Sequence, residues 1–160
     1  MFKKAVLLLA LTNFCVGCQT QYQEMGVTGG VTAMPITSDT YRIVSRGNGF
    51  TDRITVQDYS LLKAAETTLA TGNTHFMVVT GSDATSVSVG QTAGYMQTNV
   101  IGNTAYSTYM PGSTYDIVKP GQDLIIKLFN AAKGPVPPGA YAAQEIYNNI
   151  NPRVMRPKKG

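Results

Sequence analysis

Few residues in this chain have the types and spacing that chemistry requires. His75 is the only histidine among the 160 residues, so a histidine-based catalytic triad would have to use it. It stands next to an apolar run of strand length, and a structural histidine at a strand end explains it more simply. Without a second histidine, a metal ion would depend on scattered carboxylates. We therefore predict neither a triad nor a metal site.

The two cysteines, Cys15 and Cys18, have the C-x-x-C spacing of redox and zinc sites. Such sites need a βαβ context or a second pair of ligands, and this pair lies at the end of an apolar N-terminal run instead. Both cysteines are close to the N-terminus, so neither forms a disulfide across a folded domain. The pair indicates processing of the chain.

Two further patterns have simple structural explanations. Gly47-Asn48-Gly49 resembles the start of a phosphate-binding turn, but the third glycine is missing and a bend after a strand suffices. Charged residues around the helix that follows could form a cluster, and we expect them to be solvated or ion-paired supports: Arg46, Asp52, Arg53, Asp58 and Glu66. We predict no catalytic residue, no cofactor and no enzymatic activity.

The N-terminal residues have the pattern of a lipoprotein signal peptide. Met1 to Lys4 is short and basic, and Ala5 to Val16 is an apolar run that is shorter than the about 20 residues that span a bilayer. Cys15-Val16-Gly17-Cys18 resembles a lipobox, although Leu is usual where Cys15 stands. An ordinary signal peptidase would also accept this site, and that alternative stays open. We predict removal of residues 1–17 and lipidation of Cys18.

A lipidated Cys18 would make the membrane this protein's first partner. Each buried methylene contributes about 0.8 kcal/mol, so two or three acyl chains anchor a protein permanently. Gln19 follows the cysteine. By similarity to other lipoproteins of bacteria with two membranes, the absence of Asp at this position indicates the outer membrane, facing the periplasm.

The charge of the chain is concentrated at its ends. The formal net charge is +4, but Lys3 and Lys4 belong to the signal peptide and four basic residues lie in the last eight positions. The remainder is close to neutral, so we predict no nucleic-acid partner. The basic residues of 153–160 form a predicted solvated tail that could contact anionic head groups, lipopolysaccharide or peptidoglycan.

Hydrophobic periodicity predicts one α+β domain over residues 41–152, behind a flexible tether at residues 18–40. Residues 41–46 alternate as a strand does. Val56, Tyr59, Leu62, Ala65 and Leu69 follow at helical spacing, with Thr55 and Asp58 as a capping-box pair and Gly72 as the end of the helix. Residues 74–80 form the next strand. A strand-helix-strand unit thus opens the domain.

The second half of the sequence predicts a hairpin, followed by a strand and a helix that rejoin the hydrophobic core. Residues 81–121 are polar, and Gly102-Asn103 is typical of a tight turn between two strands. Residues 123–129 alternate as an amphipathic strand, and residues 142–150 have helical spacing. We predict a small mixed or antiparallel sheet, a polar β-hairpin excursion, and a C-terminal helix packed on one face.

Several segments together resemble a known group of proteins. They are Tyr41-Arg42-Ile43, Arg46-Gly47-Asn48-Gly49, the helix segment from Asp58 to Glu66, and His75-Phe76. Over roughly residues 37–153 the chain resembles a family of small bacterial putative lipoproteins named after two uncharacterised Caulobacter proteins. The resemblance implies the lipid anchor and the domain limits, and it implies no activity.

Three functions are compatible with these patterns. The first is a structural or interaction role in the cell envelope, through the hairpin or an exposed sheet edge that binds another envelope protein. The second is a sugar- or peptidoglycan-binding module, because tyrosines on an uncharged β-surface can stack on sugars. The candidate partner surface for both consists of Tyr95, Tyr106, Tyr109 and Tyr115. The third, an enzyme, would need convergent polar groups in a pocket.

Overall fold

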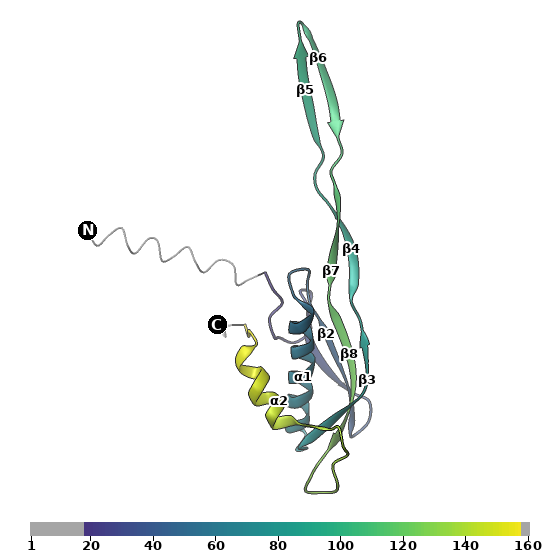
Figure 1. The fold of residues 1–160 in the computed structure, drawn as a ribbon, viewed down its shortest axis with the longest axis vertical. Coiled ribbons are helices and arrows are strands. Elements are labelled where there is room, and N and C mark those ends of the chain that lie inside the picture. The colour runs from purple at the N-terminus through teal and green to yellow at the C-terminus, as the bar shows by residue number, and fades with distance from the viewer. Residues whose placement is uncertain (1–17, 158–160) are drawn as a thin grey trace, which may run out of the picture.

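The computed structural model describes residues 18–157, which form a body and a long arm (Figure 1). The predicted signal peptide and the last three residues of the predicted basic tail lie outside the described residues. The body holds an antiparallel sheet and two helices, α1 (Arg53–Ala70) and α2 (Ala143–Ile150), which lie on one side of it. The predicted α+β class and the C-terminal helix are confirmed.

The main sheet has the strand order β1-β2-β8-β3-β9, with every neighbouring pair antiparallel. Its strands are β1 (Gly30–Pro35), β2 (Thr40–Arg46), β3 (His75–Asp83), β8 (Gly121–Phe129) and β9 (Tyr141–Ala142). The predicted unit of strand, helix and strand is β2, α1 and β3, and β8 lies between its two strands. The chain returns to the centre of the sheet only after the arm.

The core lies between the sheet and α1. Leu124, Ile126 and Leu128 of β8 are buried on the helix side, as the alternating pattern predicts. They meet Tyr59 and Leu62 of α1, which are also buried. Burial of one stripe of α1 against one face of the sheet is the main stabilising interaction of the body.

The start of α1 differs from the predicted capping box. The helix begins at Arg53, and Asp52 is its N-cap, whose carboxylate accepts hydrogen bonds from the Thr55 backbone N–H at 2.9 Å and the Thr55 hydroxyl at 2.6 Å. Asp at an N-cap satisfies a helix N–H that has no partner in the first turn. The helix ends as predicted, because Gly72 adopts φ 73° just beyond it.

The prediction of a flexible tether at residues 18–40 is wrong. Tyr22 is only 5% exposed, its ring packs edge-on against Tyr59, and its hydroxyl donates to Glu66 at 2.6 Å. The Tyr59 hydroxyl donates to the carbonyl of Thr20 at 2.8 Å. Residues 30–35 then add strand β1 to the sheet. The residues that this segment contacts are distant in the sequence, so its polar composition alone does not indicate that it is packed.

The prediction of a solvated basic tail is wrong for residues 153–157. Arg153 pairs with Asp58 at 2.9 Å, and Arg156 pairs with Glu66 at 2.7 Å. The Arg156 guanidinium also lies 4.5 Å from the centre of the Tyr22 ring, and the Tyr22 backbone N–H donates to the Met155 carbonyl. Both ends of the described chain are therefore fastened to α1, which gives these cations partners within the body.

Candidate interaction surface

A two-stranded arm, residues 85–120, projects from the body between β3 and β8 (Figure 1). Its inner part pairs β4 (Ser86–Gln91) with β7 (Thr114–Lys119), and its outer part pairs β5 (Tyr95–Ile101) with β6 (Thr104–Met110). The turn is Gly102-Asn103, where Gly102 has φ 60° and Asn103 does not have a positive φ. That is the type II′ geometry of a two-residue hairpin loop, so the predicted hairpin turn is confirmed.

The arm is one continuous ribbon with a constant register. The pairing that joins Thr80 to Ile125 in the body continues through Gly90↔Tyr115 to Ile101↔Thr104 at the tip. Thr92 and Ser113 bridge the gap between the two parts by a backbone hydrogen bond of 2.9 Å. At about 3.3 Å per residue, the arm extends about 55 Å beyond the body.

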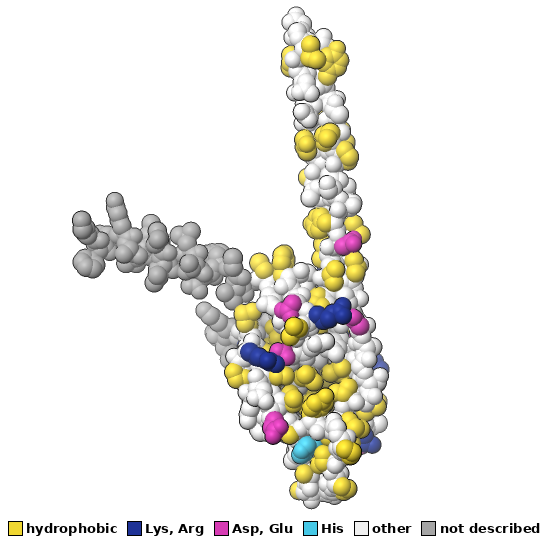
Figure 2. Space-filling view, viewed as in Figure 1, with side chains coloured by type: hydrophobic (Ala, Val, Ile, Leu, Met, Phe, Trp, Pro, Cys, Tyr) yellow, Lys and Arg dark blue, Asp and Glu magenta, His cyan; other side chains and the backbone are white. Residues whose placement is uncertain are grey.

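The surface of the arm is nearly uncharged, and groups of apolar side chains alternate along it with polar ones (Figure 2). Its charged residues are Asp116 and Lys119 alone, both near the base. Large apolar side chains are exposed along its whole length: Val87, Val89, Tyr95, Met96, Val100, Ile101, Tyr106, Tyr109, Met110, Tyr115 and Val118. Exposed apolar side chains gathered on one projecting element make the arm the candidate interaction surface of the described chain.

The four tyrosines of the predicted partner surface all lie on the arm and are exposed, but they do not share one face. Strand alternation places Tyr95 and Tyr106 on one face of the outer ribbon and Tyr109 on the other. The Tyr115 ring covers Gly90 on the opposite strand so closely that a Cβ there would lie 2.6 Å from it. Of the three tyrosines on the outer ribbon, Tyr95 and Tyr106 are the two that share a face.

Cys18 lies beside the base of the arm. The Asn48 side chain donates to the Cys18 carbonyl at 2.7 Å, which fixes the backbone of this residue on the body. An open hollow of about 640 Å³ adjoins it, and its apolar lining includes Phe50, Tyr115 and Ile117. Cys18 itself is exposed. The predicted lipidation site and the base of the arm therefore share one end of the body.

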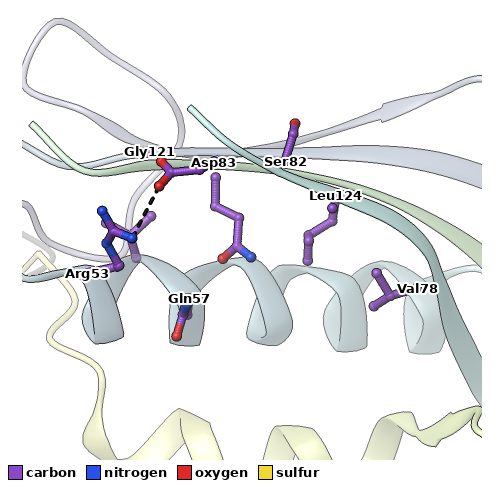
Figure 3. Close-up of a pocket in the computed structure, with 10 residues that line it drawn as sticks. Arg53, Gln57, Val78, Ser82, Asp83, Gly121 and Leu124 are labelled. Carbon is purple, nitrogen blue, oxygen red and sulfur yellow. Dashed lines mark ion pairs between the residues drawn. The ribbon is translucent and has the colours of Figure 1, made fainter. Parts of the chain in front are cut away.

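A second hollow, of about 320 Å³, lies between the first turns of α1 and the strands that lead into the arm (Figure 3). Arg53 of α1 and Asp83 of β3 form an ion pair across it at 3.2 Å. The Gln122 side-chain oxygen is buried without a hydrogen-bond partner in the described chain. Among the described residues that line it, no hydroxyl is hydrogen-bonded to a carboxylate or a histidine.

The five charged residues predicted around the start of α1 do not form one site. Arg46 pairs with Asp123 at 2.6 Å, Arg53 pairs with Asp83, and Asp58 and Glu66 pair with the C-terminal arginines. Asp52 caps the helix, and its two hydrogen bonds from Thr55, the hydroxyl first, lower its pKa below the ordinary value. The predicted supporting role of these residues agrees with these separate pairs.

Tyr22 is the most strongly perturbed ionisable group of the body. Burial, and then the hydrogen bond and negative charge of Glu66, raise its pKa far above the ordinary tyrosine value. Its phenol is therefore a hydrogen-bond donor at any physiological pH, and Glu66 accepts from it and from Arg156. Perturbed groups are candidate catalysts, but this one is enclosed in a structural contact between three segments.

His75 begins β3, where its ring nitrogen lies 2.8 Å from the Thr74 hydroxyl. Within residues 18–157, no group of three or more His, Cys, Asp and Glu side chains is placed to hold a metal ion. None of the helices that the structure describes is long and apolar enough to cross a membrane.

Comparisons with protein-family models, with curated proteins and with solved structures found no match. The resemblance to the lipoprotein family therefore stays a prediction.

Proposed function

We propose that this chain is a bacterial cell-envelope lipoprotein with a structural or interaction role, anchored through Cys18 and acting through its arm. The arm is the observation that carries the proposal. An isolated two-stranded ribbon is marginally stable in water, and an exposed strand edge with few charges is a template for another strand. A ribbon of this kind outside the core can pair through its edges with a strand of a partner protein.

The position of Cys18 supports the same proposal. Thr20, two residues further on, is buried, and its carbonyl is held by Tyr59. An acyl chain on Cys18 would therefore hold the body directly at the membrane, without a long tether between them. The base of the arm would lie at the membrane surface with it, in the outer membrane if Gln19 has the sorting effect expected of it.

The alternative function, sugar or peptidoglycan binding, would use stacking on tyrosines. On the outer ribbon it would use Tyr95 and Tyr106, which share a face, because Tyr109 lies on the other face and Tyr115 covers Gly90. Binding of the purified protein to cell-wall sacculi, compared with the double variant Tyr95→Thr and Tyr106→Thr, tests this alternative directly.

Deletion of the arm tests the proposal. In the body, the Ala84 N–H donates to the Gly121 carbonyl, so an Asn-Gly turn can replace Thr85 to Pro120 and close β3 onto β8. The intact chain, extracted from membranes in mild detergent, is expected to run on native electrophoresis as a species larger than the monomer. The deleted chain is expected to run as a monomer.

The matched control exchanges Gly102-Asn103 for Asn-Gly, which alters the tip and keeps both edges of the arm. It should retain the larger species. If the chain without the arm also retains it, another surface makes the interaction and the proposal is wrong.

A further inference from the structure

Both long edges of the arm lack a partner strand. The β4–β7 and β5–β6 ladders are each two-stranded, so the outward N–H and C=O groups of every arm strand have no cross-strand partner in the described chain. We define the outgoing edge as β4 and β5, which run away from the body, and the returning edge as β6 and β7. The two edges have opposite chain directions and equal lengths.

The body covers part of each outer edge of its main sheet, and the arm covers none of its edges. On one side of the main sheet, Val31 of β1 bonds to the segment at Gln23 and Glu24. On the other side, β9 pairs with the start of β3. Natural proteins also protect edges with lysine, proline or bulges. From Ser86 to Val118 the arm has no lysine or arginine and one proline, Pro111.

The geometry of the arm fits a second copy of the same chain. Lipidation of Cys18, as proposed, would anchor every copy at the same end of the body, because the Asn48 side chain donates to the Cys18 carbonyl there. When two such copies stand side by side without rotation, their arms point the same way and the outgoing edge of one lies beside the returning edge of the next. These edges run antiparallel, which is the pairing that each arm already uses internally.

The charge of the arm and the area of its edge are both compatible with pairing between two copies of the chain. Each outer ribbon, β5 with β6, carries no charged side chain, so copies meet there without like-charge repulsion. An edge about 55 Å long on a sheet about 10 Å thick covers about 550 Å² on each partner. The total of about 1,100 Å² exceeds the about 1,000 Å² that a specific interface needs.

We infer that the partner of the arm is a second copy of this chain, whose returning edge adds antiparallel to the outgoing edge of the first. The inference rests on the proposed function and names the partner of the same surface. Because each arm offers one edge of each kind, the contact is head-to-tail and can be repeated.

Cysteine cross-linking in membranes tests this inference. Two full-length chains with different tags, Thr98→Cys on β5 and Ser107→Cys on β6, are co-expressed and treated with a short bismaleimide. We expect the mixed 98–107 product to exceed the 98–98 and 107–107 products several-fold. The parent chain, with no added cysteine, reports any reaction of Cys18, and Gln144→Cys on α2 paired with Thr98→Cys should give no mixed product.

A charge on the edge gives an independent readout. Asn99→Lys with Thr108→Lys, added to both chains, should reduce the mixed product several-fold, because lysine opposes edge pairing. The matched pair Asn99→Gln with Thr108→Ser should leave it unchanged.

The other outcomes overturn the inference in distinguishable ways. Equal amounts of the 98–98, 107–107 and mixed products would contradict head-to-tail pairing. Arm cysteines that cross-link only to other proteins would overturn the second copy as partner and leave the proposed function intact. Arm cysteines that form no product, in a chain whose arm deletion changes nothing on native electrophoresis, would overturn both.

Discussion

Asp52 holds the beginning of α1 through both of its carboxylate oxygens, which accept from the backbone and hydroxyl of Thr55. Replacement of an N-cap Asp by Ala costs about 1 kcal/mol. We expect Asp52→Ala to lower the free energy of unfolding by about that amount at pH 7, measured by urea denaturation of the body. Asp52→Asn, which keeps a capping oxygen, should lose less.

The same residue makes the cap sensitive to acid. Its pKa is lower in the folded chain than in the unfolded one, so its contribution is complete above the unfolded pKa of about 3.9 and is lost as the pH falls through the folded value. The difference in stability between Asp52→Ala and the parent chain should therefore shrink below about pH 4. A difference that stays constant to pH 2 would contradict the role of the ionised carboxylate.

Substitutions of Tyr22 test whether the N-terminal segment is packed against the body or is a flexible tether. Its hydroxyl donates to the Glu66 carboxylate, and hydrogen bonds to charged groups contribute about 1.5 kcal/mol or more. Tyr22→Phe should lower the unfolding free energy by about 1.5 kcal/mol, and Tyr22→Ala by about 3 kcal/mol because the buried ring is lost as well. The neighbouring Gln21→Ala is the control, and equal, negligible effects at both positions would mean that the segment is not packed.

For single residues, the sequence predicts the structural role well when the residue's partners are close along the chain. The predictions for Gly72 and Gly102 are confirmed because a helix end and a hairpin turn depend on residues that are close in the sequence. Tyr22 is not predictable in this way, since its contacts with Tyr59, Glu66 and Arg156 depend on the complete fold. Its polar, glycine-rich surroundings favour a tether when read without those contacts.

For the arm, the sequence predicts a hairpin but not how far that hairpin extends from the body. Alternation of Ser86, Val87, Ser88 and Val89, together with Gly102-Asn103, is typical of a hairpin. Whether such a hairpin folds back onto the body or projects from it depends on packing partners, and here the apolar side chains find none. The predicted excursion from the core is confirmed, and the length over which its apolar side chains stay exposed is seen only in the structure.

Because the arm contributes little burial, the body should fold without it. The chain with Asn-Gly in place of Thr85 to Pro120 should unfold in urea with a free energy within about 1 kcal/mol of the intact chain, since the exposed arm side chains bury little area in the monomer. Loss of several kcal/mol would show that the arm supports the core, and the electrophoresis of this variant could then not be attributed to lost pairing.

For the whole molecule, the anchor decides where the arm acts. Cys18→Ala is expected to abolish labelling by a palmitate analogue and to release the protein from the membrane fraction, whereas the intact chain is labelled and membrane-bound. Intact mass of both purified proteins checks cleavage before residue 18. An unlabelled, soluble intact chain would contradict the anchor and indicate a diffusing protein with a free thiol.

Residue-resolved hydrogen exchange of the arm in membranes tests the central claim most directly. In an unpaired ribbon, every second amide points outward and exchanges rapidly, while the others are bonded across the hairpin. If the arm is the interaction surface, the outward amides of β5 and β6 are protected in membranes and become exposed when the protein is diluted to a monomer. Rapid exchange at every second position in both conditions would show that the edges have no partner, and would contradict the account.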